Sequence, residues 1–318
     1  MIFNDRLGNN EIIVLDGAIG TEIARLGGVM DEAAWCGVAN KTHPEVVCRV
    51  HQEYLRAGAN VVTANTFSTC RHVLAGTGLA DEAASITAKA VELARQAVDE
   101  VAPDRSVAVA GSMSNNVAWI PGTFSPDPRF LPTLEEEAAN YREVADAIAS
   151  AGADLILLEM MSDITRASLA VEAAVATGLP TWIGVSCCLL ADGSLTAWDT
   201  HTAEPAERID ASHVQQEIMP LAPVIDAMVA FEPAVMGIMH STVDATGPGL
   251  EALARRWPGP LMAYPEATGH HFVEPTDFAA HCRGWVDEGV QIIGGCCGTT
   301  VNHIRAMVEA LPEKIGRR

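Results

Sequence analysis

Eight short apolar runs, alternating with segments of helical character, constrain the fold of this chain more than any other feature. Strands that alternate with helices form a parallel sheet, and eight such units favour a closed barrel over an open sheet. The 318 residues leave room for two domains, but no repeat, low-complexity segment or linker divides them. The sequence therefore predicts an α/β fold, a (β/α)8 TIM barrel, in one domain over residues 1–318. We expect its strands at residues 12–15, 60–66, 106–110, 153–158, 181–186, 234–239, 260–264 and 291–293.

The segments between the strands carry helix signals. Thr42-His43-Pro44-Glu45 and Thr133-Leu134-Glu135-Glu136 have the Thr-x-x-Glu pattern of a capping box. Residues 115–132 are rich in Gly, Pro and Ser, and loops of this length inside a domain are usually functional or mobile. We expect helices at residues 44–56, 80–102, 133–151, 164–177, 212–221 with an extension toward 229, 276–288 and 301–311.

Charge and hydropathy argue against several classes of partner and location. The chain has 41 acidic and 20 basic residues and a formal net charge of −21. Nucleic acids and anionic membranes are bound through Lys and Arg, so we expect neither as a partner. Residues 1–11 lack the apolar core of a signal peptide, and no apolar run reaches the roughly 18 residues of a membrane span. Eight cysteines without a secretion signal are typical of a reducing compartment, which predicts a cytoplasmic protein.

Polar residues stand where the predicted strands end. Active sites of (β/α)8 barrels are built from these carboxyl ends, so the side chains should meet on one face of the barrel. Glu159 is the most informative, because a carboxylate that closes a buried strand is costly without a partner. Asp16 also fits a helix cap, and Asn65-Thr66 also fits a turn. The strand-end residues are Asp16, Asn65, Ser112, Glu159, His240, Glu266, Cys296 and Cys297.

The run Gly294-Gly295-Cys296-Cys297-Gly298 follows the last predicted strand. Adjacent side chains on a regular strand point to opposite faces, but glycine accepts backbone conformations that other residues avoid. We therefore expect the glycines to let both sulfurs converge. Two thiolates are two ligands of a possible zinc site, and a catalytic zinc needs three protein ligands. Buried core cysteines and a redox-active pair remain as alternatives.

Three blocks of sequence resemble the homocysteine S-methyltransferases, a family of zinc-dependent barrel enzymes. The blocks are residues 15–22, which read Leu-Asp-Gly-Ala-Ile-Gly-Thr-Glu, residues 51–67, and the Gly-Gly-Cys-Cys-Gly run at 294–298. Glu159 after the fourth strand matches as well, and the resemblance covers nearly the whole chain. It implies Zn²⁺ as cofactor, with Cys296 and Cys297 as two of three cysteine ligands.

The third ligand departs from the pattern of that family. The family places a cysteine after the sixth strand, where this chain has His240. We favour His240 as the ligand, because imidazole binds zinc and two cysteines with one histidine form a known catalytic set. Cys187 or Cys188, at the neighbouring strand end, is the second interpretation. In the third, the site has lost zinc.

The resemblance also implies a reaction and roles for residues. The thiol of homocysteine would take a methyl group from a cationic donor to give methionine, with the thiolate as nucleophile. Asp16 and Glu159 are the predicted catalytic residues, and Glu159 would pair with the substrate ammonium. The implied substrate-binding residues are Asp16, Gly17, Asn65, Thr66, Ser112 and Glu159.

The resemblance implies a cationic methyl donor but does not identify the compound. We favour S-methylmethionine or another sulfonium, because 318 residues leave no room for a cobalamin or folate module and betaine users typically carry a C-terminal extension. Betaine as donor, or a different acceptor thiol, is the alternative within the fold. Outside it, a metal-dependent hydrolase that uses His270 and His271 and a non-catalytic metal-binding barrel are further alternatives. The oligomeric state is not predicted.

Overall fold

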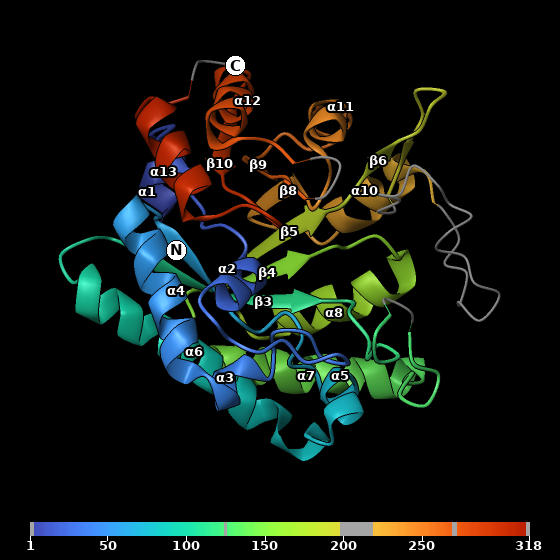
Figure 1. Ribbon diagram of the computed structural model, residues 1–318. Helices are drawn as coiled ribbons and strands as arrows, with labels where there is room; N and C mark the ends of the chain where they lie inside the picture. Colours follow the sequence, from blue (N-terminus) through green and yellow to red (C-terminus); the bar gives the residue numbers. More distant parts are fainter. Residues whose placement is uncertain (1–2, 124–125, 198–218, 269–271, 316–318) are drawn as a thin grey trace.

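An eight-stranded parallel sheet forms the centre of the computed structural model, which describes residues 3–123, 126–197, 219–268 and 272–315. Its strands lie in the order β1-β10-β9-β8-β5-β4-β3-β2, and helices surround them (Figure 1). The strands are β1 (Ile13–Val14), β2 (Val61–Ala64), β3 (Ala108–Ser114), β4 (Leu155–Glu159), β5 (Thr181–Val185), β8 (Val235–Met239), β9 (Leu261–Tyr264) and β10 (Val290–Ile293).

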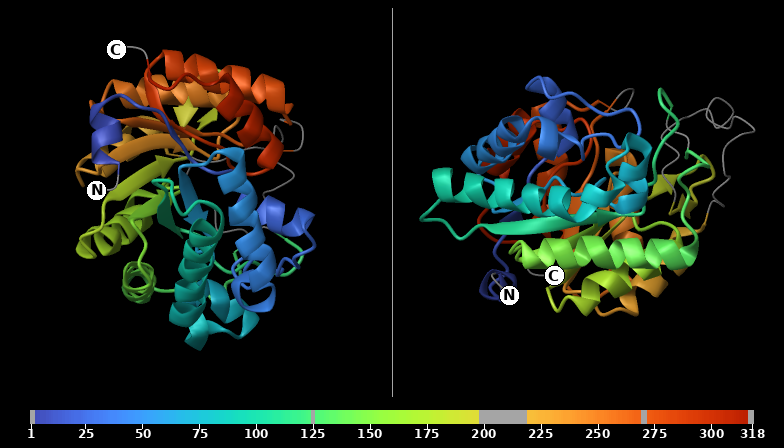
Figure 2. Two further views of the ribbon diagram at one scale, coloured as in Figure 1. Left: turned by 90° about the vertical axis from the view of Figure 1, so that its left-hand side faces the viewer. Right: turned by 90° about the horizontal axis from the view of Figure 1, so that it is seen from below.

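The two strands at the ends of this order, β1 and β2, are also joined to each other. The Asn60 N–H donates to the Val14 carbonyl over 2.7 Å, and the Asp16 N–H donates to the Val61 carbonyl over 3.1 Å. Leu15 and Val61 form a parallel bridge between them. These contacts close the sheet, so the predicted (β/α)8 barrel is confirmed. The left view of Figure 2 shows the helices as a ring outside the strands.

The outer ring is made of amphipathic helices that each cover part of the sheet. The longer helices are α2 (Ile19–Arg25), α4 (Pro44–Ala57), α6 (Ala83–Val101), α7 (Leu134–Ser150), α8 (Ile164–Ala176), α10 (Leu221–Val229), α11 (Val243–Ala254), α12 (Pro275–Asp287) and α13 (Val301–Ala310). The short elements are α1 (Asn4–Gly8), α3 (Ala39–Thr42), α5 (Arg71–Leu74), the 3₁₀ turns η1 (Ala75–Thr77) and η2 (Ala80–Glu82), and the hairpin strands β6 (Cys188–Leu189) and β7 (Leu195–Thr196).

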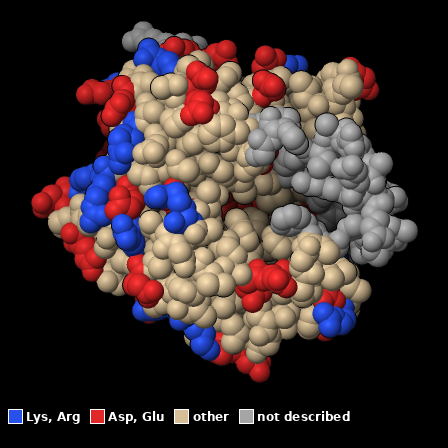
Figure 3. All heavy atoms as spheres, in the orientation of Figure 1, with Lys and Arg blue, Asp and Glu red and all other residues tan. Residues whose placement is uncertain are grey.

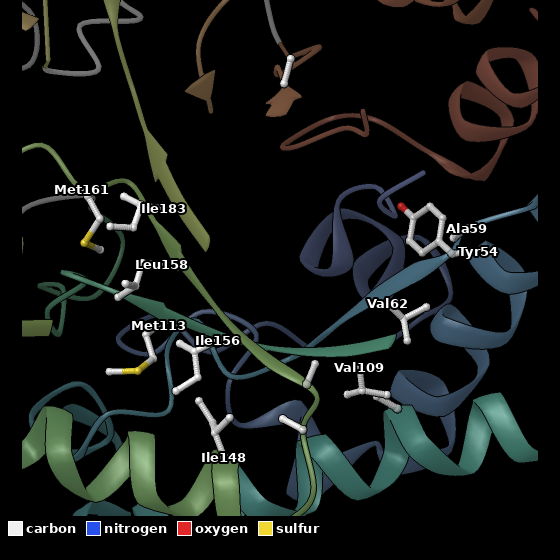
Figure 4. Close-up of a cluster of buried hydrophobic side chains, with 14 of the residues drawn as sticks. Tyr54, Ala59, Val62, Val109, Met113, Ile148, Ile156, Leu158, Met161 and Ile183 are labelled. Carbon is white, nitrogen blue, oxygen red and sulfur yellow. The ribbon is translucent and has the colours of Figure 1, made fainter. Parts of the chain in front are cut away.

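Two apolar layers hold the barrel. Side chains such as Trp182 and Met262 fill its interior, whereas outward-facing ones such as Ile156 pack against the helices. Figure 4 shows Ile148 of α7 directed toward the strands from this outer side. A Cβ on Gly111 of β3 would lie 2.1 Å from an Ile148 methyl carbon, so glycine is needed for α7 to approach this closely.

One predicted helix cap is wrong and one is confirmed. Thr42 does not cap α4, because it is the last residue of α3 and its hydroxyl donates to a carbonyl within that turn. The residue that precedes α4 is His43, whose side chain makes no capping bond to the helix. At α7 the predicted capping box is present: the Thr133 hydroxyl accepts the Glu136 N–H, and the Glu136 carboxylate accepts the Thr133 N–H.

Helix α11 was not predicted between the sixth and seventh barrel strands. Gly247, Pro248 and Gly249 break the apolar periodicity there, but Thr242 caps the helix by accepting the Ala245 N–H over 3.2 Å. Strand β3 also runs beyond its predicted end at residue 110, because residues 111–114 pair with β4. Most of the helix expected at 212–221 lies outside the described residues, and α10 is found at the predicted extension.

No helix in the described part of the chain is long and apolar enough to cross a membrane. In Figure 3, acidic and basic side chains are gathered toward the edge of the visible face, and the surface around its central hollow is largely uncharged.

His51 on α4 makes the unfolding free energy of the barrel depend on pH in the acidic range. It is fully buried, neither ring nitrogen has a hydrogen-bond partner among the described residues, and burial lowers its pKa from 6.5 to about 4. The folded state therefore holds a neutral imidazole, while the unfolded chain takes up a proton below pH 6.5. Stability from this group is present above pH 6.5 and falls between pH 6.5 and 4, by about 3 kcal/mol.

We expect His51→Leu to flatten that acid dependence. Urea unfolding at several pH values between 4 and 7 would measure it, with His281→Gln on the exposed side of α12 as control. Equal slopes of unfolding free energy against pH for wild type and His51→Leu would contradict the assignment.

Candidate metal centre

Three potential metal ligands meet at the carboxyl ends of β8 and β10. His240 directly follows β8, and Cys296 and Cys297 follow β10 after two glycines. The Cys296 Sγ lies 3.5 Å from His240 Nδ1 and 3.9 Å from the Cys297 Sγ. The three ligand atoms all lie within 4.8 Å of one another, and no other such group of His, Cys, Asp and Glu occurs among the described residues.

The spacing of these atoms fits a tetrahedral zinc ion. Bond lengths of about 2.3 Å for Zn–S and 2.0–2.1 Å for Zn–N imply sulfur–sulfur edges of roughly 3.8 Å and sulfur–nitrogen edges of roughly 3.6 Å. The two printed separations, 3.9 and 3.5 Å, are close to these values. Two thiolates and one imidazole are also a donor set that zinc accepts, and the set leaves a fourth position open.

Close packing explains two of the glycines in this turn. We expected them to supply unusual backbone angles, but among the run only Gly298 has a positive φ, of 77°. A Cβ on Gly294 would lie 2.8 Å from the Asp16 carbonyl oxygen, and one on Gly295 would lie 2.4 Å from the Thr299 hydroxyl. The chain thus passes close to Asp16, just after β1, and to Thr299, just before α13. His240 itself has a positive φ of 43°, a strained conformation of the kind found at functional sites.

The alternative third ligands point elsewhere. Cys187 is buried, and its Sγ donates to the Ala245 carbonyl over 3.5 Å. A Cβ on Gly249 would lie 2.7 Å from the same sulfur, so the thiol faces α11 and the outer layer. Cys188 begins β6, with its Sγ 3.9 Å from the Leu189 carbonyl. Neither thiol belongs to the cluster. His270 and His271 lie outside the described residues.

The two thiols of the cluster differ in protonation. The Cys296 thiol donates to Cys297, and this bond together with the nearby His240 holds the Cys297 pKa well below 9. The same shared proton, reinforced by burial, raises the pKa of Cys296. Burial is the largest single effect on the His240 pKa and lowers it, but the charge and hydrogen bond of Cys297 and the charges of Glu266 and Glu159 together outweigh burial, so the pKa is raised. The cluster therefore favours negative charge at Cys297, which suits the binding of a metal cation.

Two carboxylates stand beside this cluster. Glu159, at the end of β4, is nine-tenths buried and accepts a short hydrogen bond from the Ser112 hydroxyl on β3. Burial raises the pKa of Glu159 to about 7, and the Cys297 charge adds to the rise. The Glu266 carboxylate, just beyond β9, is buried and lies 3.8 Å from His240 Nδ1.

Asp16 binds mainly to the neighbouring strand. One carboxylate oxygen accepts the Thr63 N–H over 2.6 Å, and the other accepts the Thr63 hydroxyl over 2.8 Å. Burial raises the Asp16 pKa to about 7, against the lowering effect of these bonds. Asp16 thus joins β1 to β2 where the barrel closes. Its neighbour Gly17 packs against Tyr54, where a Cβ would lie 2.8 Å from the phenol oxygen.

The polar groups of Asn65 and Thr66 are already used within the protein. The Asn65 amide donates to the Cys36 carbonyl and to Asn40 Oδ1, and its oxygen accepts the Cys36 thiol over 3.0 Å. The Thr66 hydroxyl donates to the Ser112 carbonyl over 2.7 Å. In this structure both residues hold the wall of the site, and their predicted contact with substrate stays a prediction.

Sequence reasoning missed Tyr264, the last residue of β9. Its buried ring belongs to the interior of the barrel, and the charges of Glu159, Cys296 and Asp16 all act on its hydroxyl. A tyrosine that closes an apolar strand is typical of a core residue, so the sequence gave no reason to single it out. The facing glycine on β5, Gly184, becomes informative only once the barrel is closed.

Comparison with known proteins decides the family. A sequence profile described as Homocysteine S-methyltransferase matches residues 13–311. The chain belongs to the homocysteine S-methyltransferase family. The predicted resemblance and the predicted class of enzyme are thereby confirmed.

Members and relatives of the homocysteine S-methyltransferase family match most of this chain. It is 27% identical to the Homocysteine S-methyltransferase of Escherichia coli K12, over 95% of this chain and 96% of that protein. It is 26% identical to Betaine–homocysteine S-methyltransferase 1 of Danio rerio, over 98% of this chain and 76% of that protein. The match to the Methionine synthase of Mycobacterium tuberculosis, at 29% identity, covers 95% of this chain but only 25% of that protein.

A solved structure agrees with the fold. The metallated form of the homocysteine methyltransferase MmuM from Escherichia coli superposes with a TM-score of 0.73 at 24% identity, over 96% of this chain and 99% of that one. At this identity the match supports the barrel itself.

Proposed function

We propose that this protein is a zinc-dependent methyltransferase that moves a methyl group from a cationic donor to the thiol of homocysteine, giving methionine. The observation that carries the proposal is the cluster of His240, Cys296 and Cys297 at tetrahedral spacing, beside the buried carboxylate of Glu159. Zinc bound there would lower the pKa of a coordinating thiol, so that the acceptor is present as its thiolate.

The reaction balances without another reactant. The homocysteine sulfur forms a bond to the methyl carbon, and the bond from that carbon to the positively charged atom of the donor breaks. The electron pair of that bond stays on the donor, which leaves as a neutral molecule if it was a sulfonium. The thiol proton is released to solvent.

Glu159 and Ser112 are proposed to hold the amino-acid end of the acceptor. The Ser112 hydroxyl fixes one carboxylate oxygen of Glu159, which leaves the other to accept an N–H of the substrate ammonium. Asp16, with the backbone of Gly17, lies just beyond the end of β1 and is proposed to line the same pocket. Its two bonds to Thr63 restrict its carboxylate to a fixed position.

The donor is proposed to be a sulfonium such as S-methylmethionine. Asp16, Glu159 and Glu266 are buried carboxylates at strand ends on the face of the barrel that carries the cluster, and negative charge in a site shielded from water favours a cation. Betaine is cationic as well, so an assay with both donors separates them.

The first experiment is the metal content of protein purified without added metal. We expect about one zinc per chain in the wild type and a sharp decrease in His240→Ala, because two thiolates alone hold zinc weakly. Cys187→Ser is the matched control, since this thiol faces α11, and it should keep its zinc. Zinc lost from Cys187→Ser but retained in His240→Ala would make Cys187 the third ligand.

The same preparations then test the reaction. Wild-type protein with homocysteine should form methionine from S-methylmethionine faster than from betaine, and His240→Ala should be inactive. Zinc bound without methyl transfer from either donor would favour a hydrolase or a non-catalytic metal-binding barrel. No zinc in the wild type would reject the metal site itself.

A further inference from the structure

The hydroxyl of Tyr264 is a buried polar group without a partner. The residue closes β9 and is 2% exposed, and no described residue forms a hydrogen bond with its hydroxyl. A buried donor left unpaired costs about 1–3 kcal/mol, and nearly all such groups in folded proteins are satisfied. An unpaired hydroxyl in an active site is therefore a candidate contact for a ligand.

The barrel makes room for this hydroxyl. A Cβ on Gly184 of β5 would lie 2.5 Å from the phenol oxygen and 2.7 Å from the Met239 side chain. The ring thus crosses the interior from β9 toward β5, and the oxygen occupies the space that a side chain at residue 184 would fill. Any residue other than glycine there would move the hydroxyl.

The surroundings of the hydroxyl are negative. Burial raises the Tyr264 pKa well above 10, and the nearby carboxylates of Glu159 and Asp16 raise it further. The hydroxyl therefore keeps its proton and lies near the carboxylates of Glu159 and Asp16. The Glu159 carboxylate is near enough to raise the pKa of the hydroxyl. A cation placed between them would meet acceptors on both sides.

We propose that Tyr264 is a substrate-binding residue whose hydroxyl oxygen, together with the Glu159 carboxylate, holds the ammonium group of the acceptor. An ammonium has three N–H donors, and a phenol oxygen has lone pairs to accept one of them. The proposal rests on the proposed function, because it assumes an amino-acid thiol as acceptor. It adds a contact that discriminates homocysteine from thiols without an amine.

Tyr264→Phe tests this with two acceptors. Homocysteine and 4-mercaptobutanoate, which has the same thiol and carboxylate but no amine, are titrated calorimetrically into zinc-loaded wild type and variant. We expect the variant to bind homocysteine about 10-fold more weakly, since a hydrogen bond to a charged group is worth about 1.5–3 kcal/mol. Its affinity for 4-mercaptobutanoate should stay the same. Zinc content should also be unchanged, because the ring is not a ligand.

Tyr141→Phe is the control for loss of a buried tyrosine hydroxyl. That hydroxyl donates to Glu137 over 2.6 Å on α7, so the variant should lose stability without a change in either affinity. Gly184→Ala, which displaces the Tyr264 hydroxyl, should reproduce the selective loss.

Three outcomes would overturn the role of Tyr264. Equal weakening of both thiols by Tyr264→Phe would mean that the hydroxyl acts on the thiol or on packing. Unchanged homocysteine affinity would mean that it contacts no part of the acceptor. Loss of zinc would make the residue a support of the metal cluster. If wild-type protein binds neither thiol, the proposed function fails instead, and the failure is visible before any variant is examined.

Discussion

Replacing Cys297 with serine is expected to abolish methyl transfer by removing the metal. The Cys297 thiol is the one whose pKa the site lowers, through the bond from Cys296 and the nearby His240. It is thus the sulfur that its surroundings favour as a thiolate. A serine hydroxyl stays protonated at neutral pH and is a poor zinc ligand. Changes in residues that only support metal ligands cost 10–100-fold in affinity, so we expect a loss of more than about 100-fold here.

The measurement is zinc affinity by competition with a chelator, followed by activity with saturating metal. Cys282→Ala is the matched control, because this thiol is buried in α12 within the outer core. It should change stability without changing zinc affinity. A Cys297→Ser protein that holds zinc as tightly as the wild type would show that the metal is bound elsewhere. Activity that persists without zinc would reject the proposed chemistry.

The barrel could be predicted from sequence because its strands are buried on both faces. Such strands are continuous apolar runs, and residues 153–158 and 234–239 lie close to the observed β4 and β8. The ends of strands were harder to predict, since pairing decides them. Strand β3 extends to Ser114 only because β4 lies beside it. Helix α11 was missed because its Gly-Pro-Gly sequence is that of a turn.

The candidate site could be predicted where its residues form unusual local sequence patterns. A glutamate after an apolar run and two adjacent cysteines between glycines are visible without a structure. Tyr264 is not, because only its contact with Gly184 in the folded barrel shows that its hydroxyl points into the interior. For Asn65 the structure adds a contact that the sequence does not reveal. Its amide is occupied by Cys36 and Asn40, a contact between distant segments that no local pattern contains.

Glu159→Gln is expected to separate substrate binding from metal binding. The substitution keeps the shape and hydrogen-bonding capacity of the side chain but removes its charge. Losing one member of a buried charge pair costs about 2–5 kcal/mol, so the KM for homocysteine should rise about 30-fold or more. The zinc content should match the wild type, because Glu159 lies outside the cluster of ligands.

Two further variants test whether the effect of Glu159→Gln is specific to substrate binding. Ser112→Ala removes the hydroxyl that fixes Glu159, and it should raise the KM in the same direction by about 10-fold, the effect of one hydrogen bond to a charged group. Glu137→Gln removes a charge as deeply buried, but that carboxylate pairs with Arg166 on α8. It should lower the melting temperature and leave the KM unchanged. If Glu159→Gln instead lost zinc while its KM for homocysteine stayed normal in added metal, Glu159 would serve the metal, and the ammonium would have to be held by another group.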